Sequence, residues 1–193
     1  ELVLRLHRTL RARRQPYRIV FVPDPVAWTE APEDLETLAR QRRRWQRGLA
    51  ESLWENRQIA FSRHGGVAGW VAFPFFVIFE LFGPLIEVSG YVVMTVAAAL
   101  GILSVEGFIA FMAVAVGLGI LLSTSALLLE ELSFRCYPRA RDTLLLALAA
   151  VAENLGYRQL TAFWRLQALI AWIARREVEW GVMKRRATWA EKG

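Results

Sequence analysis

The stretch FIAFMAVAVGLGILLSTSALLL, residues 108–129, decides the fold of this chain. It contains no charged side chain, and about 20 apolar residues in a helix are enough to cross the hydrocarbon core of a bilayer. A helix that is hydrophobic on every side is either buried in a large protein or surrounded by lipid. The sequence therefore predicts a membrane-spanning helix over residues 108–129.

The charges of the chain are concentrated on both sides of this stretch. Between residues 66 and 129 the charged side chains are Glu80, Glu87 and Glu106, although the whole chain has 24 Lys+Arg and 18 Asp+Glu. Charges at the ends of apolar blocks are typical of integral membrane proteins. The 55% hydrophobic content argues against disorder, and Cys136, the single cysteine, excludes a disulfide framework.

A second apolar region, residues 67–105, is longer than one crossing requires, and proline interrupts it twice. We expect an interfacial or re-entrant helix at about 67–86 and a crossing at 88–105. Residues 142–174 begin apolar and become mixed, which fits either a third crossing with a polar face or a half-crossing followed by an interfacial helix. The complete membrane region would be residues 66–174.

The positive-inside rule predicts the topology. Arginines follow the 108–129 segment, and they should lie on the same side as the arginine-rich region near residue 43. We therefore expect residues 1–65 and the basic tail, 175–193, in the cytosol, with the protein in a plasma membrane of bacterial type.

The first 60 residues have a different pattern. Residues 1–14 have helical spacing, residues 17–22 and 26–29 are predicted strands, and a further helix should run from about Pro32 to about Asn56. This order suits the end of an α/β domain whose body lies upstream. The opening residues resemble the middle of a helix, so we expect the chain to be a fragment of a longer protein.

The most informative motif in that last helix is Gln41-Arg42-Arg43-Arg44-Trp45. At about 100° per residue, Gln41, Arg44 and Trp45 share one face with Gly48. Arg43 points away, and a leucine face is expected to pack on the domain: Leu35, Leu38, Leu49 and Leu53. An arginine can bind a pair of phosphate oxygens, and an indole can stack on a sugar or a base. The alternative is a solvated basic face next to a membrane segment.

This motif resembles the Q-x-x-R-W motif of processive family 2 glycosyltransferases, the membrane synthases of cellulose, chitin, hyaluronan and poly-N-acetylglucosamine. Thr29-Glu30-Ala31-Pro32 precedes it, as in bacterial members. The resemblance implies a mainly α chain in which residues 1–60 end a cytosolic GT-A α/β domain and transmembrane and interfacial helices follow.

The resemblance also implies roles for the motif residues. Gln41 and Arg44 would contact the diphosphate of the donor, and Trp45 would stack beneath the acceptor sugar. The catalytic base and the ligands of Mg²⁺ or Mn²⁺ would lie upstream of Glu1, so the chain alone should be inactive. The implied reaction is inverting transfer from a nucleotide-sugar, expected to be a UDP-sugar, to a growing polysaccharide that is also exported.

Two other functions stay open, and the possible partners include more than the donor. The sugar acceptor could be a lipid in place of a glycan, or the chain could be a non-catalytic membrane anchor or assembly module whose arginines bind anionic lipid. An accessory membrane subunit is a further expected partner. A nucleic-acid role is not expected, because the basic residues flank an apolar block.

Four polar residues of the membrane region are candidates for a glycan path: Glu80, Glu87, Tyr157 and Arg158. Ionisable side chains at membrane depth usually face protein or water, so they could accept or donate hydrogen bonds to sugar hydroxyls. The alternative is that the two glutamates lie at headgroup level or pair with an arginine such as Arg158. Trp164 and Trp172 are possible stacking surfaces.

Overall fold

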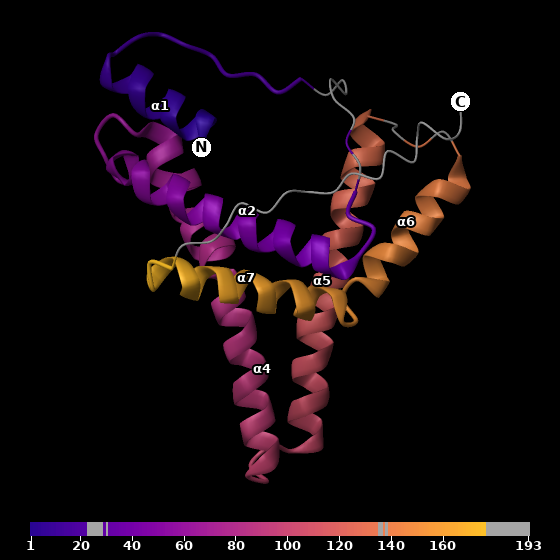
Figure 1. Ribbon diagram of the computed structural model, residues 1–193. Coiled ribbons are helices and arrows are strands. Elements are labelled where there is room, and N and C mark those ends of the chain that lie inside the picture. The colour runs from indigo at the N-terminus through magenta and orange to yellow at the C-terminus, as the bar shows by residue number, and fades with distance from the viewer. Residues whose placement is uncertain (23–28, 30, 135–136, 138, 177–193) are drawn as a thin grey trace. The chain divides into compact units, whose positions relative to one another are not determined.

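The computed structural model describes residues 1–22, 29, 31–134, 137 and 139–176. Its regular elements in these ranges are helices, which confirms the mainly α fold class. The chain divides into two compact units. Unit 1 comprises Glu1–Pro84 together with the chain from Trp164 onward, and unit 2 comprises Leu85–Phe163. Figure 1 shows the helices of both units.

Unit 1 begins with helix α1 (Leu2–Ala12), as the helical spacing of residues 1–14 predicted. On its surface, His7 Nδ1 is hydrogen-bonded to the hydroxyl of Tyr17, and Arg11 Nε donates to the same hydroxyl at 2.7 Å. Partial burial and the charge of Arg11 lower the pKa of His7 below its ordinary value. The neutral imidazole is therefore the favoured form in the folded protein.

The predicted strand over residues 17–22 is wrong. These residues form no strand in the described part of the chain, and the side chains from Ile19 to Val22 are exposed. A β-branched, aromatic run becomes a strand only where another strand supplies hydrogen-bonding partners. The second predicted strand, 26–29, lies outside the described residues except for Thr29.

Helix α2 (Leu35–Glu55) carries the motif. The Asp34 carboxylate caps it by accepting hydrogen bonds from the Thr37 backbone N–H at 2.7 Å and from the Thr37 hydroxyl at 2.8 Å. These hydrogen bonds hold the pKa of Asp34 below its ordinary value. The helix begins three residues after Pro32, because the cap at Asp34 fixes the start.

A small core joins α2 to the rest of unit 1. It gathers side chains from α2, from the short 3₁₀ helix η1 (Arg57–Ile59), from the apolar helix that follows and from the end of the last helix. Its buried members are Ala50, Leu53, Ile59, Phe73, Leu81 and Leu169. The predicted leucine face is wrong at Leu35, which is 64% exposed. Leu53 is buried and Leu49 packs against the core, as expected, and the buried side of α2 also carries Gln46 and Ala50.

Residues 68–99 form one long, interrupted helical run. It consists of the π-helical segment η2 (Ala68–Ala72), the short α3 (Phe73–Phe75), the π-helical η3 (Phe76–Leu81) and α4 (Gly83–Ala99). The expected segments were 67–86 and 88–105, but the interruption lies at Phe82. Pro84, the second residue of α4, explains this position, because proline lacks an N–H and suits the first turn of a helix.

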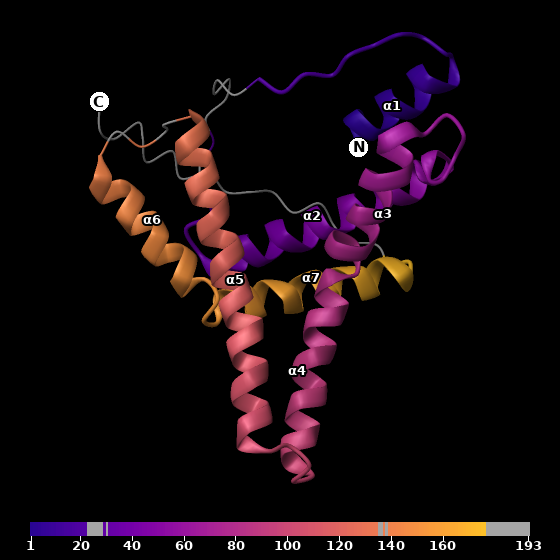
Figure 2. The same cartoon turned by 180° about the vertical axis from the view of Figure 1, so that it is seen from behind.

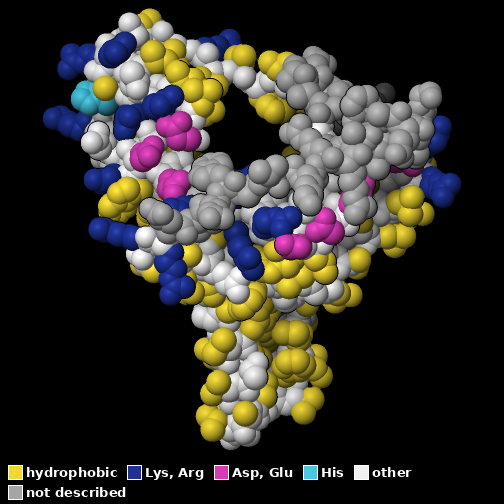
Figure 3. All heavy atoms as spheres, in the orientation of Figure 1, with side chains coloured by type: hydrophobic (Ala, Val, Ile, Leu, Met, Phe, Trp, Pro, Cys, Tyr) yellow, Lys and Arg dark blue, Asp and Glu magenta, His cyan; other side chains and the backbone are white. Residues whose placement is uncertain are grey.

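In unit 2, α4 and α5 (Val105–Phe134) lie side by side and are joined through residues 100–104 (Figures 1 and 2). Hydrophobic side chains cover much of the visible face of these helices in Figure 3. The runs Ala68–Ala99 and Val105–Phe134 are both long and apolar enough to cross a membrane. The second contains the predicted 108–129 segment.

Residues 142–174 do not form one helix. They divide into α6 (Ala140–Ala152), which packs on α5, and α7 (Tyr157–Ile173). Gly156 adopts φ +101° between them, and its N–H donates to Gln159 Oε1 at 2.7 Å. Helix α6 ends at Ala152, before this turn, and the glutamine caps the start of α7. A helix of this length, about 20 Å, is shorter than the roughly 30 Å core of a bilayer, so α6 cannot be a complete crossing.

Candidate functional site: the motif face of α2

The motif residues lie in the middle of α2, on the side opposite Gln46 and Ala50. Trp45 is 54% exposed, while Gln41 and Arg44 are partly exposed. A Cβ added at Gly48, one turn after Arg44, would meet no atom within 4 Å. Gln46 and Ala50, on the other side, are 2% and 0% exposed. The motif therefore presents an amide, a guanidinium and an indole beside an open glycine.

The neighbouring arginines of α2 are occupied by other groups of the protein. Arg40 pairs with Glu36, and the Arg42 guanidinium lies over the Trp45 ring, 4.9 Å from its centroid. Arg47 pairs with Glu51 at 2.7 Å and also donates to the backbone oxygen of Arg176. These contacts fix the basic residues that flank the motif.

Arg44 differs from these neighbours. Helix α2 contains five arginines, and within the described residues Arg44 alone among them makes no ion pair, hydrogen bond or ring contact. Its guanidinium therefore keeps its donors for a ligand. Gln41 and Arg44 are three residues apart on one helix, which places their side chains next to each other and within reach of one anionic group.

Arg43 does not simply point away, as the helical wheel predicted. Its Nη2 donates to Gln167 Oε1 on α7 at 2.8 Å. A contact between residues 124 positions apart is not visible in local sequence spacing. Arg43 therefore has a structural role and is not a neutral comparison for Arg44.

Directly after the motif lies a residue that the sequence did not single out, Gln46. Its Oε1 accepts from Arg165 Nε at 2.8 Å, and its Nε2 donates to the Leu81 backbone oxygen at 3.1 Å. Arg165 Nη2 also donates to Glu80, to the backbone oxygen at 2.8 Å and to the carboxylate at 3.0 Å. The only sign of this cluster in the sequence was that its polar residues stand on otherwise apolar helix faces.

Of the glycan-path candidates, Glu80 is part of this unit 1 cluster, whereas Glu87 belongs to unit 2. Glu87 Oε1 accepts from Arg158 Nε at 3.0 Å and from the Tyr91 hydroxyl at 2.7 Å. The two glutamates thus pair with different arginines. Pairing with an arginine was the alternative to a role in a glycan path. Tyr157 begins α7 and is 39% exposed.

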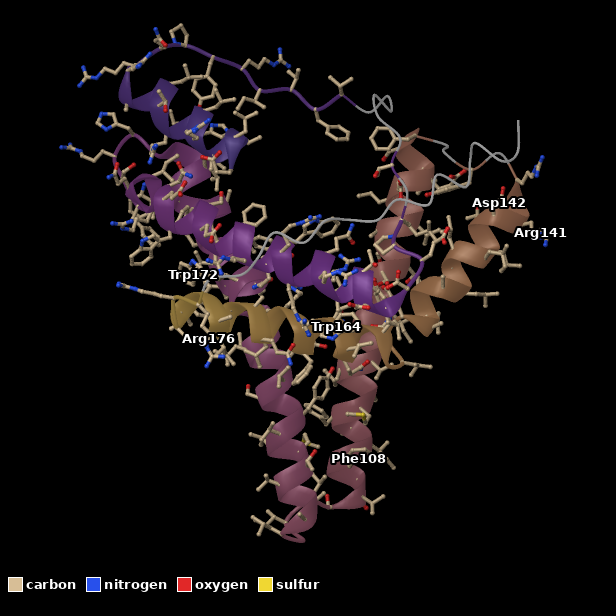
Figure 4. The ribbon with its side chains drawn as sticks, viewed as in Figure 1. Phe108, Arg141, Asp142, Trp164, Trp172 and Arg176 are labelled. Carbon is tan, nitrogen blue, oxygen red and sulfur yellow. The ribbon has the colours of Figure 1, made fainter. Side chains whose placement is uncertain are left out.

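The two tryptophans proposed as stacking surfaces are part of the packing of unit 1. Figure 4 shows Trp164 and Trp172 on α7. Trp164 is 8% exposed, so its ring faces cannot stack on a sugar. Trp172 packs edge to face against Trp54, with ring centroids 6.1 Å apart. Trp45 is therefore the better candidate for a stacking surface.

A metal site was expected upstream of Glu1, and the described residues supply none of their own. Among them, no group of three or more His, Cys, Asp or Glu side chains is placed to hold a metal ion. These described residues do not fit a site for Mg²⁺ or Mn²⁺.

Comparison with known families supplies the class of reaction. The family described as glycosyl transferase family group 2 matches residues 6–128, which include most of α1, all of α2 and α4, and most of α5. This chain belongs to that family. Membership supports a glycosyl transfer function, with a nucleotide-sugar donor and an acceptor as binding partners. Comparison with curated proteins and with solved structures gives no match.

Proposed function

We propose that this family 2 glycosyltransferase is membrane-embedded and inverting, and that it transfers sugar from a UDP-sugar to a growing polysaccharide, which it also exports. The observation that carries the proposal is the state of Arg44. Its guanidinium has no partner within the described residues, although the four other arginines of α2 are engaged. A charge kept available on a partly exposed helix face is suited to an anionic ligand.

In the proposed reaction, Arg44 binds oxygens of the donor diphosphate and stabilises the negative charge that develops on it as the sugar leaves. Gln41 donates its amide N–H groups to the same diphosphate from one turn away. Trp45 stacks on the acceptor sugar, and Arg42 holds the indole from its other side by a cation–π contact. The open space at Gly48 leaves room for the ligand.

The remaining parts of the proposal rest on the two apolar helical runs and on the family. Ala68–Ala99 and Val105–Phe134 are proposed to cross the membrane, with residues 1–65 on the cytosolic side. The base that deprotonates the acceptor hydroxyl and the metal ligands are proposed to lie upstream of Glu1. Glu80, Glu87, Tyr157 and Arg158 remain proposed contacts of the glycan.

The experiment is nucleoside diphosphate release from membranes that carry the complete protein, with a panel of UDP-sugars. Wild type is compared with Arg44→Ala and Arg63→Ala. Arg63 is the matched control, because it is exposed and makes no hydrogen bond or ion pair with other described residues. Removing one such charge contact to a leaving group costs on the order of a hundredfold in rate. We expect that loss for Arg44→Ala and wild-type release for Arg63→Ala.

Product analysis separates the other functions. A long glycan product supports the proposed reaction, while a single sugar on a lipid would replace the polysaccharide with a lipid acceptor. If no donor is turned over, or if both arginine variants behave alike, the arginines serve as a general basic surface. The membrane-anchor function would then be preferred.

A further inference from the structure

The interruption of the apolar helix lies next to two backbone carbonyl oxygens of unit 1, those of Glu80 and Leu81. In a regular α-helix the N–H of residue 84 would donate to the Glu80 oxygen, but Pro84 has no N–H. Phe82 N–H instead donates five residues back, to Val77, in the π-helical segment η3. The Glu80 oxygen therefore needs a donor from elsewhere, since a buried carbonyl without a partner is costly.

Two side chains from distant parts of the sequence satisfy these carbonyls. Gln46 Nε2 lies 3.1 Å from the Leu81 oxygen and 3.4 Å from the Glu80 oxygen. Arg165 Nη2 donates to the Glu80 oxygen at 2.8 Å, and Arg165 Nε donates to Gln46 Oε1 at 2.8 Å. We call these three residues, Gln46, Arg165 and Glu80, the carbonyl clamp. It joins α2, η3 and α7.

The clamp determines the rotation of α2 about its axis. Gln46 is 2% exposed and directly follows Trp45, on the opposite side of the helix from Arg44. Apolar contacts tolerate small rotations, but hydrogen bonds lose strength quickly when their geometry changes. A helix whose buried amide is hydrogen-bonded on both its oxygen and its nitrogen is therefore fixed in rotation, and its exposed face is fixed with it.

We propose that Gln46 and Arg165 are positioning residues of the glycosyl transfer reaction, which hold Arg44 in the orientation that binds the donor diphosphate. This inference rests on the proposed function of Arg44. Arg43 and Arg47 reinforce the same joint, because they donate to Gln167 and to the backbone of Arg176 from the flank of α2. Arg165 contributes through α2 and does not itself touch the substrate.

The test is a double-mutant cycle read by ligand affinity. The dissociation constant of UDP is measured on the complete protein in membranes for wild type, Arg44→Ala, Arg165→Ala and the double variant, with Arg63→Ala as control. We expect each single variant to weaken UDP binding about tenfold, because a mispositioned or missing charge-assisted hydrogen bond has that magnitude. The double variant should bind UDP no more weakly than Arg44→Ala, since Arg165 acts through Arg44.

A purely structural role predicts a different result. Arg165→Ala would then lower the amount of folded protein while the remaining molecules bound UDP with wild-type affinity, and the inference would be overturned. The inference would also be overturned if the double variant raised the dissociation constant of UDP by the product of the two single effects. If Arg165→Ala is not recovered from membranes, Arg165→Lys replaces it with the same expectation, because an ammonium group cannot reproduce the planar fork that bonds Gln46 and Glu80 together.

The two proposals fail in different ways. If Arg44→Ala leaves UDP affinity unchanged, the proposed function of the motif face is wrong. If Arg44→Ala weakens UDP binding and Arg165→Ala does not, the proposed function stands and only the positioning role of the clamp is lost.

Discussion

Glu80 and Glu87 lie seven residues apart, and each pairs with an arginine of α7, yet the two clusters are built differently. The unit 1 cluster uses backbone oxygens exposed by a helix interruption and a buried glutamine. The unit 2 cluster consists of side chains: Glu87 with Tyr91 and Arg158. Similar ion pairs can thus have different structural roles, because the groups that surround each pair determine which elements it connects.

The largest expected effect compares one buried amide from each unit, Gln46 and Asn154, both 2% exposed. Gln46→Ala removes the partner of Arg165 Nε and a donor to the Leu81 oxygen, so we expect a loss of about 2–3 kcal/mol of stability. Asn154 donates to the Ala150 oxygen, and its contact with Arg158 is long, at 3.5 Å. Asn154→Ala should cost about 1 kcal/mol. Thermal unfolding in detergent measures both, and equal losses would remove the distinction between the units.

The next effect compares two glycines. A Cβ at Gly119 on α5 would lie 2.1 Å from Asn154 Oδ1 and 2.7 Å from Arg158 Nη1, so Gly119→Ala should destabilise unit 2 by about 1–2 kcal/mol. Gly48→Ala is the control, because the same methyl group enters open space on α2. It should stabilise the helix by about 0.5–1 kcal/mol. If the unfolding midpoints of both variants shifted in the same direction, the close packing at Gly119 and the open space at Gly48 would not explain the result.

A smaller effect separates the two glutamates. Glu87→Gln weakens the hydrogen bonds from Tyr91 and Arg158 to a side chain that is 22% exposed, so we expect a loss of about 1 kcal/mol. Glu80→Gln should cost only a few tenths of a kcal/mol, since the Glu80 side chain is 48% exposed and Arg165 keeps the backbone oxygen. A larger loss for Glu80→Gln, measured by the same unfolding assay, would show that the carboxylate and not the carbonyl is the important acceptor.

The smallest effect is a pH dependence confined to unit 1, which contains both histidines of the chain, His7 and His64. Burial and Arg11 lower the pKa of His7, so the folded state favours its neutral form. The resulting stabilisation is present above the ordinary histidine pKa of 6.5 and is lost as the pH falls through the lower folded pKa. The protection factors of the α1 amides, which compare each exchange rate with the intrinsic rate at the same pH, should therefore fall between about pH 7.5 and about pH 5.5. The fall should be larger in wild type than in His7→Gln.

Several features of the fold follow from local pattern. The uncharged run of residues 108–129 predicted a long apolar helix by its length and composition, and residues 1–14 predicted α1 by their helical spacing. The strand prediction at 17–22 failed since strand formation depends on a partner. The sequence left two alternatives for residues 142–174, one helix or two, because apolar content alone does not locate the turn that Gly156 makes between α6 and α7.

The motif face was predictable from local spacing, whereas the clamp was not. Helical spacing alone placed Gln41, Arg44 and Trp45 on one side of α2. That spacing could not reveal that Arg43 bonds Gln167, that Trp164 is buried, or that Gln46 meets Arg165. Each of these contacts joins residues more than 100 positions apart or depends on packing between helices.

The sequence by itself determined the helical character, the apolar runs and the residues that share the motif face, because each depends on the composition or the helical spacing of residues close together in the chain. The tertiary structure decided which polar groups are engaged. Arginines with identical chemistry stand side by side on α2, and only the surrounding elements distinguish the one whose guanidinium stays available, Arg44, from those that hold the helix in place.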